Sequence, residues 1–188
     1  MRKIIVSEMV SVDGFFAGED GNINWHVVDE EFNQYAINLL NTVDTILFGR
    51  VTYDIFENYW PAAAKDPKTG KSDLEIADKI NDAVKIVFSK TLKKVGWNNV
   101  HLMEEVTPEE INKLKQQTGK DIVVYGSGTI VQKLTELGLV DEYRFFVAPV
   151  VLGKGKALLK NLKDNLKLKL VKTGSFGSGV VVLCYQPG

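Results

Sequence analysis

The stretch 121–134 constrains the fold of this chain more than any other, because it joins a buried strand to a helix through a glycine turn. Residues 122–125 form a short run rich in β-branched side chains, which is typical of a strand buried on both faces. Gly126-Ser127-Gly128-Thr129 follows directly, and apolar residues then recur at helical spacing over residues 130–137. This order predicts a helix N-terminus whose backbone N–H groups can bind a phosphate.

Two glycines in such a turn are also compatible with a purely structural role. Gly126 and Gly128 are not followed by a third glycine at the spacing of the dinucleotide-binding fingerprint, and the motif lies far from the N-terminus. A standard Rossmann unit is therefore not expected. The phosphate hypothesis depends on other parts of the chain.

Composition narrows the class of protein. The 188 residues are most simply one domain, residues 1–188, and 45% hydrophobic with 25% charged residues is ordinary for a globular protein. A formal net charge of −1 gives no reason to expect a nucleic acid or an anionic membrane as a partner. The chain shows no signal-peptide pattern or membrane-length apolar segment, and its single cysteine, Cys184, lies in an apolar run. We therefore expect a cytoplasmic protein with a buried thiol.

Alternating strands and helices predict an α/β fold. Strands are expected at the apolar or alternating runs 3–12, 43–48, 84–88, 100–103, 122–125, 142–147, 166–173 and 180–185. Helices are expected at 29–40, shortly after residue 53, at 74–80, at 107–117 and after the glycine turn. Together they predict a three-layer fold: a mostly parallel central sheet, helices on both faces and a C-terminal antiparallel strand pair. Residues 15–24 are expected to form a loop, and residues 61–72 a polar surface insertion.

Side chains suited to phosphate follow three of these predicted strands. Gly49-Arg50-Val51-Thr52 offers a helix N-terminus, a guanidinium and a hydroxyl, and Ser89-Lys90-Thr91 offers hydroxyls and an ammonium. The third strand end is the glycine turn. Each segment alone is an ordinary turn. Because ligands of open parallel sheets bind outside the carboxyl ends of the strands, the three together predict a ligand with several phosphates.

The ordered set of motifs resembles the dihydrofolate-reductase fold. The motifs are Val10-Ser11-Val12-Asp13-Gly14, Trp25, Ile46 to Tyr53, Val87 to Lys90 and Val124 to Gly128. The segment from Pro149 to Gly155 resembles the branch that includes the C-terminal reductase domain of the bacterial riboflavin biosynthesis protein RibD. The resemblance covers nearly the whole chain. It implies an NADPH-binding reductase with an eight-stranded sheet, and often a homodimer.

The resemblance also implies roles for individual residues. Gly49, Arg50 and Thr52 would hold the pyrophosphate side of NADPH together with the turn Gly126-Ser127-Gly128-Thr129. Ser89 and Lys90 would bind the adenosine 2′-phosphate, which favours NADPH over NADH, and a cation with hydroxyls also suits a dianion physically. The segment from Asp13 to Trp25, which includes Phe16, would close over the nicotinamide.

Three carboxylates are candidates for the catalytic group: Asp29, Glu30 and Asp13. The first two follow Trp25, where dihydrofolate reductase holds its substrate with a carboxylate, but Asp29 is equally suited to cap a helix and Glu30 to interact with its dipole. Asp13 could contact substrate or brace its loop. His26 is the one group here that titrates near neutral pH, although a half-exposed loop histidine fits the pattern as well. No cluster of His, Cys and carboxylates predicts a metal site.

The leading hypothesis is an NADPH-dependent reductase of a small heteroaromatic or imine substrate, such as a pterin or the ribosylaminopyrimidine of riboflavin synthesis. The alternative is an NADP-binding module without turnover, for regulation or redox sensing. The missing carboxylate motifs of the substrate site motivate this alternative, and the chain departs from the family pattern at two positions. Tyr125 stands where the riboflavin reductases have an acidic residue, and the stretch 25–28 lacks the proline expected there.

Overall fold

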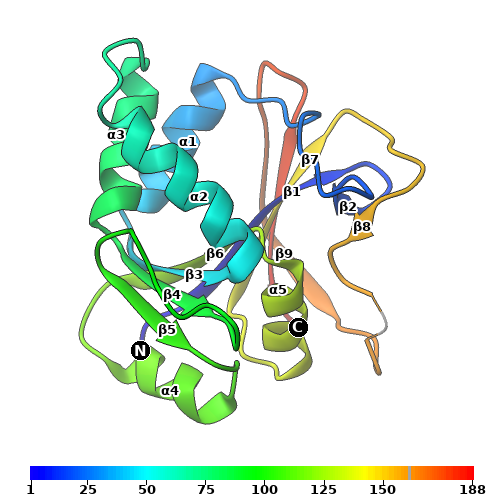
Figure 1. The fold of residues 1–188 in the computed structure, drawn as a ribbon. Helices are drawn as coiled ribbons and strands as arrows, with labels where there is room; N and C mark the ends of the chain where they lie inside the picture. Colours follow the sequence, from blue (N-terminus) through cyan, green and yellow to red (C-terminus); the bar gives the residue numbers. More distant parts are fainter. Residues whose placement is uncertain (161) are drawn as a thin grey trace.

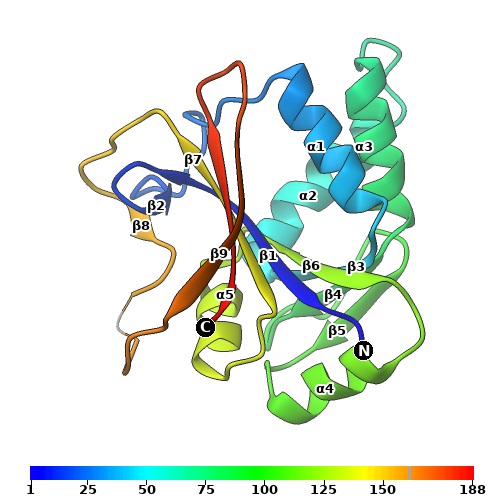
Figure 2. The same cartoon turned by 180° about the vertical axis from the view of Figure 1, so that it is seen from behind.

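The computed structural model describes residues 1–160 and 162–188, and a twisted eight-stranded sheet runs through the middle of that part of the chain (Figures 1 and 2). Its strands are β1 Ile4–Ser11, β3 Val43–Gly49, β4 Val84–Phe88, β5 Val100–Met103, β6 Asp121–Tyr125, β7 Glu142–Ala148, β9 Leu168–Ser175 and β10 Val181–Pro187. They lie in the order β5-β4-β3-β6-β1-β7-β10-β9. Neighbours from β5 to β7 pair in parallel, whereas β10 is antiparallel to both β7 and β9. The predicted mostly parallel sheet with a C-terminal antiparallel pair is confirmed.

Five helices cover the sheet in the described part of the chain. They are α1 Glu30–Leu40, α2 Arg50–Ala63, α3 Lys71–Asp82, α4 Pro108–Gln116 and α5 Gly128–Glu136. Two begin as the sequence predicts, because the side chain of Asp29 accepts a hydrogen bond from Phe32 N at the start of α1, and Thr107 accepts one from Glu110 N at the start of α4. Within residues 1–160 and 162–188, no helix has the length and apolar character that crossing a membrane requires.

Both faces of the sheet are packed, as the fold prediction requires. α4 and α5 cover one face, where Val6 and Val124 of the central strands pack against Val131 of α5. α1, α2 and α3 cover the other face, where Ile5 of β1 belongs to the second hydrophobic cluster. Because successive side chains of a strand point to opposite faces, β1 contributes to both layers, and the residues of its middle are buried.

Two segments differ from the sequence-based expectation. α2 continues through Pro61 to Ala63 and α3 begins at Lys71, so the predicted surface insertion 61–72 is a loop only over residues 64–70. Pro61 lies in the last turn of α2, where it has no N–H to donate to the backbone oxygen of Glu57, so the helix lacks one hydrogen bond just before its end. The segment expected as loop contains a short strand, β2 Phe15–Ala17, which pairs with β8 Lys156–Ala157 in a separate two-stranded sheet. Strands this short, paired over such a chain distance, leave no periodic signal in the sequence.

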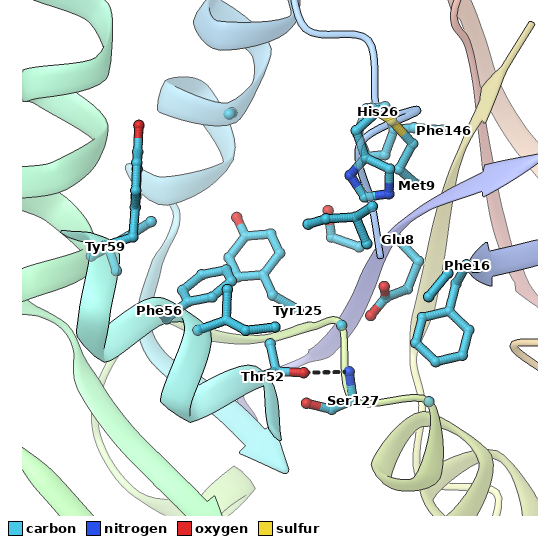
Figure 3. A pocket seen from close by; sticks show the side chains of 18 of the residues that line it. Glu8, Met9, Phe16, His26, Thr52, Phe56, Tyr59, Tyr125, Ser127 and Phe146 are labelled. Carbon is cyan, nitrogen blue, oxygen red and sulfur yellow. Dashed lines mark hydrogen bonds between the residues drawn. The ribbon is translucent and has the colours of Figure 1, made fainter. Parts of the chain in front are cut away.

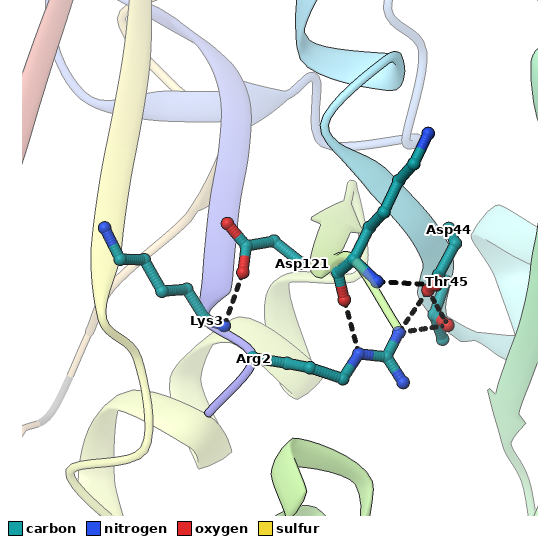
Figure 4. Close-up of polar contacts among 6 residues, drawn as sticks. Arg2, Lys3, Asp44, Thr45 and Asp121 are labelled. Atoms are coloured by element: carbon teal, nitrogen blue, oxygen red, sulfur yellow. Dashed lines mark hydrogen bonds and ion pairs between the residues drawn. The ribbon is translucent and has the colours of Figure 1, made fainter. Parts of the chain in front are cut away.

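A cluster of polar contacts joins three chain segments at the amino end of the sheet (Figure 4). Arg2, 7% exposed, donates to Thr45 Oγ1 at 2.6 Å, to the carboxylate of Asp44 and to the backbone oxygen of Lys120. These four residues, the amino-end cluster, tie the start of β1 to β3 and to the chain entering β6. The guanidinium of Arg2 is therefore buried, with acceptors for Nε and Nη2 supplied by three residues.

Candidate active site

A cavity of about 990 Å³ opens at the carboxyl end of the sheet and extends along α1 and α2. β1, β3 and β6 contribute Glu8, Gly49 and Tyr125 to its wall, and β2 contributes Phe16. Its volume is at the upper end of the range typical of small-molecule sites. The position outside the strand ends is the one that the fold predicts for a ligand.

Two of the three predicted strand ends meet directly at this cavity. Gly49 N donates to Ser127 Oγ at 2.8 Å, and Ser127 N donates to Thr52 Oγ1 at 2.9 Å (Figure 3). Gly126 has a φ of +54°, and a Cβ added there would lie 2.7 Å from Thr52 Oγ1. A side chain is excluded at Gly126 by both conformation and space. A Cβ at Gly128 would lie 2.7 Å from the ring of Phe16, so the short strand β2 packs directly against the glycine turn.

The helices that begin at these two strand ends have no side-chain cap. The N-cap residue of α2 is Gly49, which has no side chain. The N-cap residue of α5 is Ser127, whose side chain accepts no hydrogen bond from the first turn of the helix. The backbone N–H groups of both first turns therefore lack the side-chain acceptor that Asp29 and Thr107 provide for α1 and α4. Two such helix N-termini at one rim favour an anionic ligand.

The third strand end lies beside this rim. The guanidinium of Arg50 donates to Thr91 Oγ1 at 3.4 Å and also lies 3.5 Å from Asp54 Oδ2, so it points along the rim toward the end of β4. Ser89 Oγ accepts from Leu92 N at 3.0 Å and shapes the turn. The exposed ammonium of Lys90 is paired with Glu105. Ser89 and Lys90 are outside the cavity wall, whereas Gly49, Arg50, Thr52 and the residues 126–129 are part of it.

The three carboxylates chosen as catalytic candidates have structural partners. Asp29 accepts from Phe32 N and, with its second oxygen, from Ser178 N at 2.7 Å, so it caps α1 and anchors the β9–β10 hairpin. Asp13 accepts from Leu152 N at 3.1 Å and from Gly153 N at 2.7 Å, which is the loop-bracing alternative. Glu30 is exposed and bonded to Ser72.

None of these three carboxylates lines the cavity. The structure therefore gives no geometric support for a catalytic role of Asp29, Glu30 or Asp13. The helix-cap prediction for Asp29, in contrast, is confirmed.

The aromatic residues of the segment 13–25 have separate positions. Phe16 lines the cavity, whereas Trp25 packs in a third hydrophobic cluster with Phe32 and Phe146. His26 lines the cavity, and its ring packs edge-on against the Trp25 ring with the two centroids 4.5 Å apart. Burial lowers the pKa of His26 and outweighs a contact with the Phe16 backbone that raises it, so the imidazole is neutral above mildly acidic pH.

Glu8 is the cavity residue that sequence reasoning missed (Figure 3). It is 4% exposed, its Oε1 has no hydrogen-bond partner among the described residues, and burial raises the pKa of the carboxyl well above its usual range. The signal was present in the sequence. Glu8 is the one charged residue in the strand 4–10, and an acid that such a strand buries without a partner is a candidate functional group.

The part of the cavity that faces α1 and α2 is aromatic. The rings of Tyr125 and Phe56 stack with centroids 6.1 Å apart, and Tyr35 and Phe146 contribute from α1 and β7. Burial raises the pKa of Tyr125, and burial combined with the contact to Cys184 outweighs Arg144 and raises the pKa of Tyr35 to about 12. Both phenols are therefore neutral at physiological pH. This aromatic half suits a flat, weakly polar compound.

The fold and the position of its cavity define a dihydrofolate-reductase-like domain. A putative riboflavin biosynthesis protein from Shewanella sp. PV-4 has a similar structure, with a TM-score of 0.73, 21% identity and 99% of each chain covered. Dihydrofolate reductase from Enterococcus faecalis, solved in complex with NADP(H) and RAB-propyl, gives a TM-score of 0.63 at 13% identity, with 99% of this chain and 96% of that chain covered.

Sequence similarity identifies the family of the chain within this fold. The model of the RibD C-terminal domain matches residues 2–182, so the chain belongs to the RibD C-terminal domain family. YyaP of Bacillus subtilis (strain 168) is 38% identical over 185 residues, which is 98% of this chain and 95% of YyaP. YwjB of the same organism is 30% identical over 181 residues, 95% of each chain.

Proposed function

We propose that this protein is an NADPH-dependent reductase of a small heteroaromatic or imine compound. The observation that carries the proposal is the meeting of two uncapped helix N-termini with the guanidinium of Arg50 at one rim of a largely apolar cavity. Pyrophosphate needs that combination of N–H donors and a cation, and the rest of a dinucleotide needs an adjoining apolar space. Membership of the RibD C-terminal domain family supports the same function.

The residues at the rim fit the cofactor. The first-turn N–H groups of α2 and α5, the Thr52 hydroxyl and the Arg50 guanidinium would hold the pyrophosphate. Lys90 and Ser89 would bind the 2′-phosphate, because Thr91 brings the end of β4 to Arg50. The ion pair of Lys90 with Glu105 is exposed, so exchanging it for a phosphate costs little.

Bound NADPH would supply a hydride, and the protein has to align the acceptor and exclude water. The aromatic half of the cavity does both, because Tyr125 and Phe56 form a flat, apolar wall next to the glycine turn. The cytoplasmic location and the homodimer implied by the family resemblance stay predictions.

Calorimetric titration of the purified protein with NADPH and with NADH tests this proposal. We expect micromolar binding of NADPH and at least tenfold weaker binding of NADH, because only NADPH carries the 2′-phosphate. Binding of NADPH no tighter than millimolar contradicts the cofactor assignment. Tight binding without any NADPH oxidation across pterins, pyrimidines and imines favours the non-catalytic NADP-binding module instead.

A further inference from the structure

Glu8 is the one acid that the fold buries in the wall of the cavity without a partner for Oε1 among the described residues. The even-numbered neighbours on its side of β1, Val6 and Val10, belong to the hydrophobic cluster beneath α5. An apolar side chain at position 8 would continue that cluster and would stabilise the fold more than an unpaired acid does. The carboxyl therefore needs an explanation outside folding.

The strand register places Glu8 at the junction of the two halves of the cavity. Ser7 pairs with Tyr125, the last residue of β6, so Glu8 is the first residue of β1 beyond the end of that strand. The carboxyl lies between the glycine turn and the ring of Phe16 (Figure 3). On one side lies the rim suited to phosphates, and on the other lies the aromatic half with Met9 and Tyr125. A group that must serve both a dinucleotide and its reaction partner has to lie at this junction.

The surroundings of Glu8 keep it protonated. The titratable or charged groups on the elements around it are His26 of the loop after β2, Tyr125 of β6, Tyr35 of α1 and Arg144 of β7. His26 and both tyrosines are neutral near pH 7, and Arg144 is bonded to Glu142 at 2.6 Å. Burial is the cause that raises the Glu8 pKa, and a neutral carboxylic acid is a hydrogen-bond donor.

The charges of the cavity also limit its occupant. In the part of the chain that the structure describes, the cations of the cavity wall are Arg50 and Lys156, and both are exposed. Arg50 is directed toward Asp54 and Thr91, and Lys156 lies beside Gly21. The aromatic half therefore offers no cation to a phosphate, so it fits a compound without a phosphate or other anionic group.

We propose that Glu8 is the acid of this site: its protonated carboxyl donates a hydrogen bond, and then the proton, to a nitrogen or carbonyl oxygen of a planar, uncharged substrate. This inference rests on the proposed reductase function. Reduction of a C=N bond adds a hydride, two electrons with one hydrogen, at carbon and a proton at nitrogen. The hydride comes from NADPH, which becomes NADP⁺, and the proton comes from Glu8, which becomes a carboxylate and is reprotonated from water.

Infrared difference spectroscopy tests the protonation state without any substrate. Wild-type protein and Glu8→Gln, both labelled with ¹³C at the glutamate carboxyl, are compared from pH 5 to pH 10. We expect a protonated-carboxyl C=O band at pH 7 that belongs to Glu8 and disappears only at alkaline pH. Glu136→Gln, at an exposed position of α5, should leave that band unchanged. An ionised Glu8 at pH 7 overturns the proposal, and this holds whether or not the protein binds NADPH.

NADPH binding separates an acid from a cofactor contact. We expect the dissociation constant of Glu8→Gln for NADPH to stay within about twofold of wild type, because the carboxyl serves the substrate. A tenfold loss assigns Glu8 to the cofactor and overturns the proposal. If wild type itself fails to bind NADPH, the reductase function fails, while the infrared result still reports on Glu8.

Turnover is then measured with a 7,8-dihydropterin, a cyclic imine, a quinone and a ribosylaminopyrimidine phosphate. On every compound that wild type reduces, Glu8→Gln should lower kcat by about 10²–10³-fold with a smaller change in KM. The decrease of kcat that wild type shows at alkaline pH should be absent from the variant. Glu8→Asp should recover part of the rate. An unchanged kcat in Glu8→Gln, or a preference of wild type for the phosphorylated compound, contradicts the proposal.

Discussion

Arg2 and Glu8, six residues apart at the start of the chain, are ionisable side chains buried at opposite ends of the sheet, and the fold treats them in opposite ways. At the amino end, Arg2 is surrounded by acceptors from Asp44, Thr45 and Lys120. At the carboxyl end, Glu8 is equally buried, but its Oε1 has no partner among the described residues. A buried charge with satisfied donors holds elements together, whereas a buried acid without a partner lowers the stability of the fold.

This difference indicates where selection acts on stability and where it acts on chemistry. The contacts of Arg2 join the amino ends of the strands, at the opposite end of the sheet from the cavity. Glu8 shares its end of the sheet with the uncapped starts of α2 and α5. Among the described residues, the buried Glu8 Oε1 and His26 Nε2 lack a hydrogen-bond partner and line the cavity, where a ligand would provide one.

The largest effect is expected at the amino end. Arg2→Ala should lower the free energy of unfolding by about 3 kcal/mol, because it removes the buried guanidinium that joins Asp44, Thr45 and Lys120. Urea denaturation measures the change. Arg2→Lys should lose less, since the ammonium keeps the charge but not the planar fork of donors. A loss below about 1 kcal/mol would contradict the stabilising role of Arg2. A change in NADPH affinity would contradict a role of Arg2 that is confined to stability.

Arg50→Ala should act on binding alone. We expect the dissociation constant for NADPH to rise about tenfold, or about 1.4 kcal/mol, because a charge-assisted contact to phosphate is lost. The side chain is 57% exposed, so the melting temperature should change little. Lys169→Ala, which removes an exposed cation on β9, serves as the control in the same titration. Equal affinities for Arg50→Ala and wild type would exclude Arg50 from the site.

Glu8→Gln should stabilise the protein at alkaline pH. A carboxyl whose pKa is higher in the folded than in the unfolded state causes no penalty below the unfolded value of about 4.3. As the pH rises toward the folded pKa, stability is lost, because the unfolded chain releases the proton more easily. At pH 8 the variant should exceed wild type by about 1 kcal/mol, since one pKa unit corresponds to about 1.4 kcal/mol. Parallel melting temperatures from pH 5 to pH 8 would contradict a buried, protonated Glu8.

The smallest effect is expected for Asp29→Asn. Asparagine caps a helix about as well as aspartate, but it has one acceptor oxygen in place of two. The hydrogen bond from Ser178 N and the interaction of the charge with the α1 dipole are therefore lost, about 0.5–1 kcal/mol together. Turnover should be unchanged, because both carboxylate oxygens are bonded to backbone N–H groups away from the cavity. A turnover rate that falls by about two orders of magnitude would restore Asp29 as the catalytic carboxylate.

Most of the fold can be predicted from the sequence, because its signals are local. Apolar runs predict the parallel strands, and the helix starts at Asp29 and Thr107-Pro108 follow from side chains that satisfy the first turn. The convergence of Arg50 and Ser127 follows from the rule that parallel strands end at one side of the sheet. The β2–β8 pair cannot be predicted, because its stabilisation comes from packing between residues far apart in the chain.

The candidate site is only half predictable. Glycines and hydroxyls leave a recognisable turn pattern at the rim, whereas the pattern for an acid in the loop after Trp25 is ambiguous, because Asp29 fits a helix cap equally well. The apolar run of β1 predicts a strand, but it does not reveal what its one acidic position faces. Which side chains face a cavity depends on strand register, and the register of β1 against β6 is set by tertiary contacts.

The placement of Glu8 inside a central strand restricts how this site can evolve. β1 is hydrogen-bonded on both sides, with Ser7 opposite Tyr125 and Glu8 opposite Phe145. Inserting or deleting one residue would turn every side chain of the strand to the other layer and expel the acid from the cavity. Family members that act on different compounds should therefore keep the length of this strand and differ in the amino acid at the position of Glu8. That amino acid should correlate with the kind of reaction that each member catalyses.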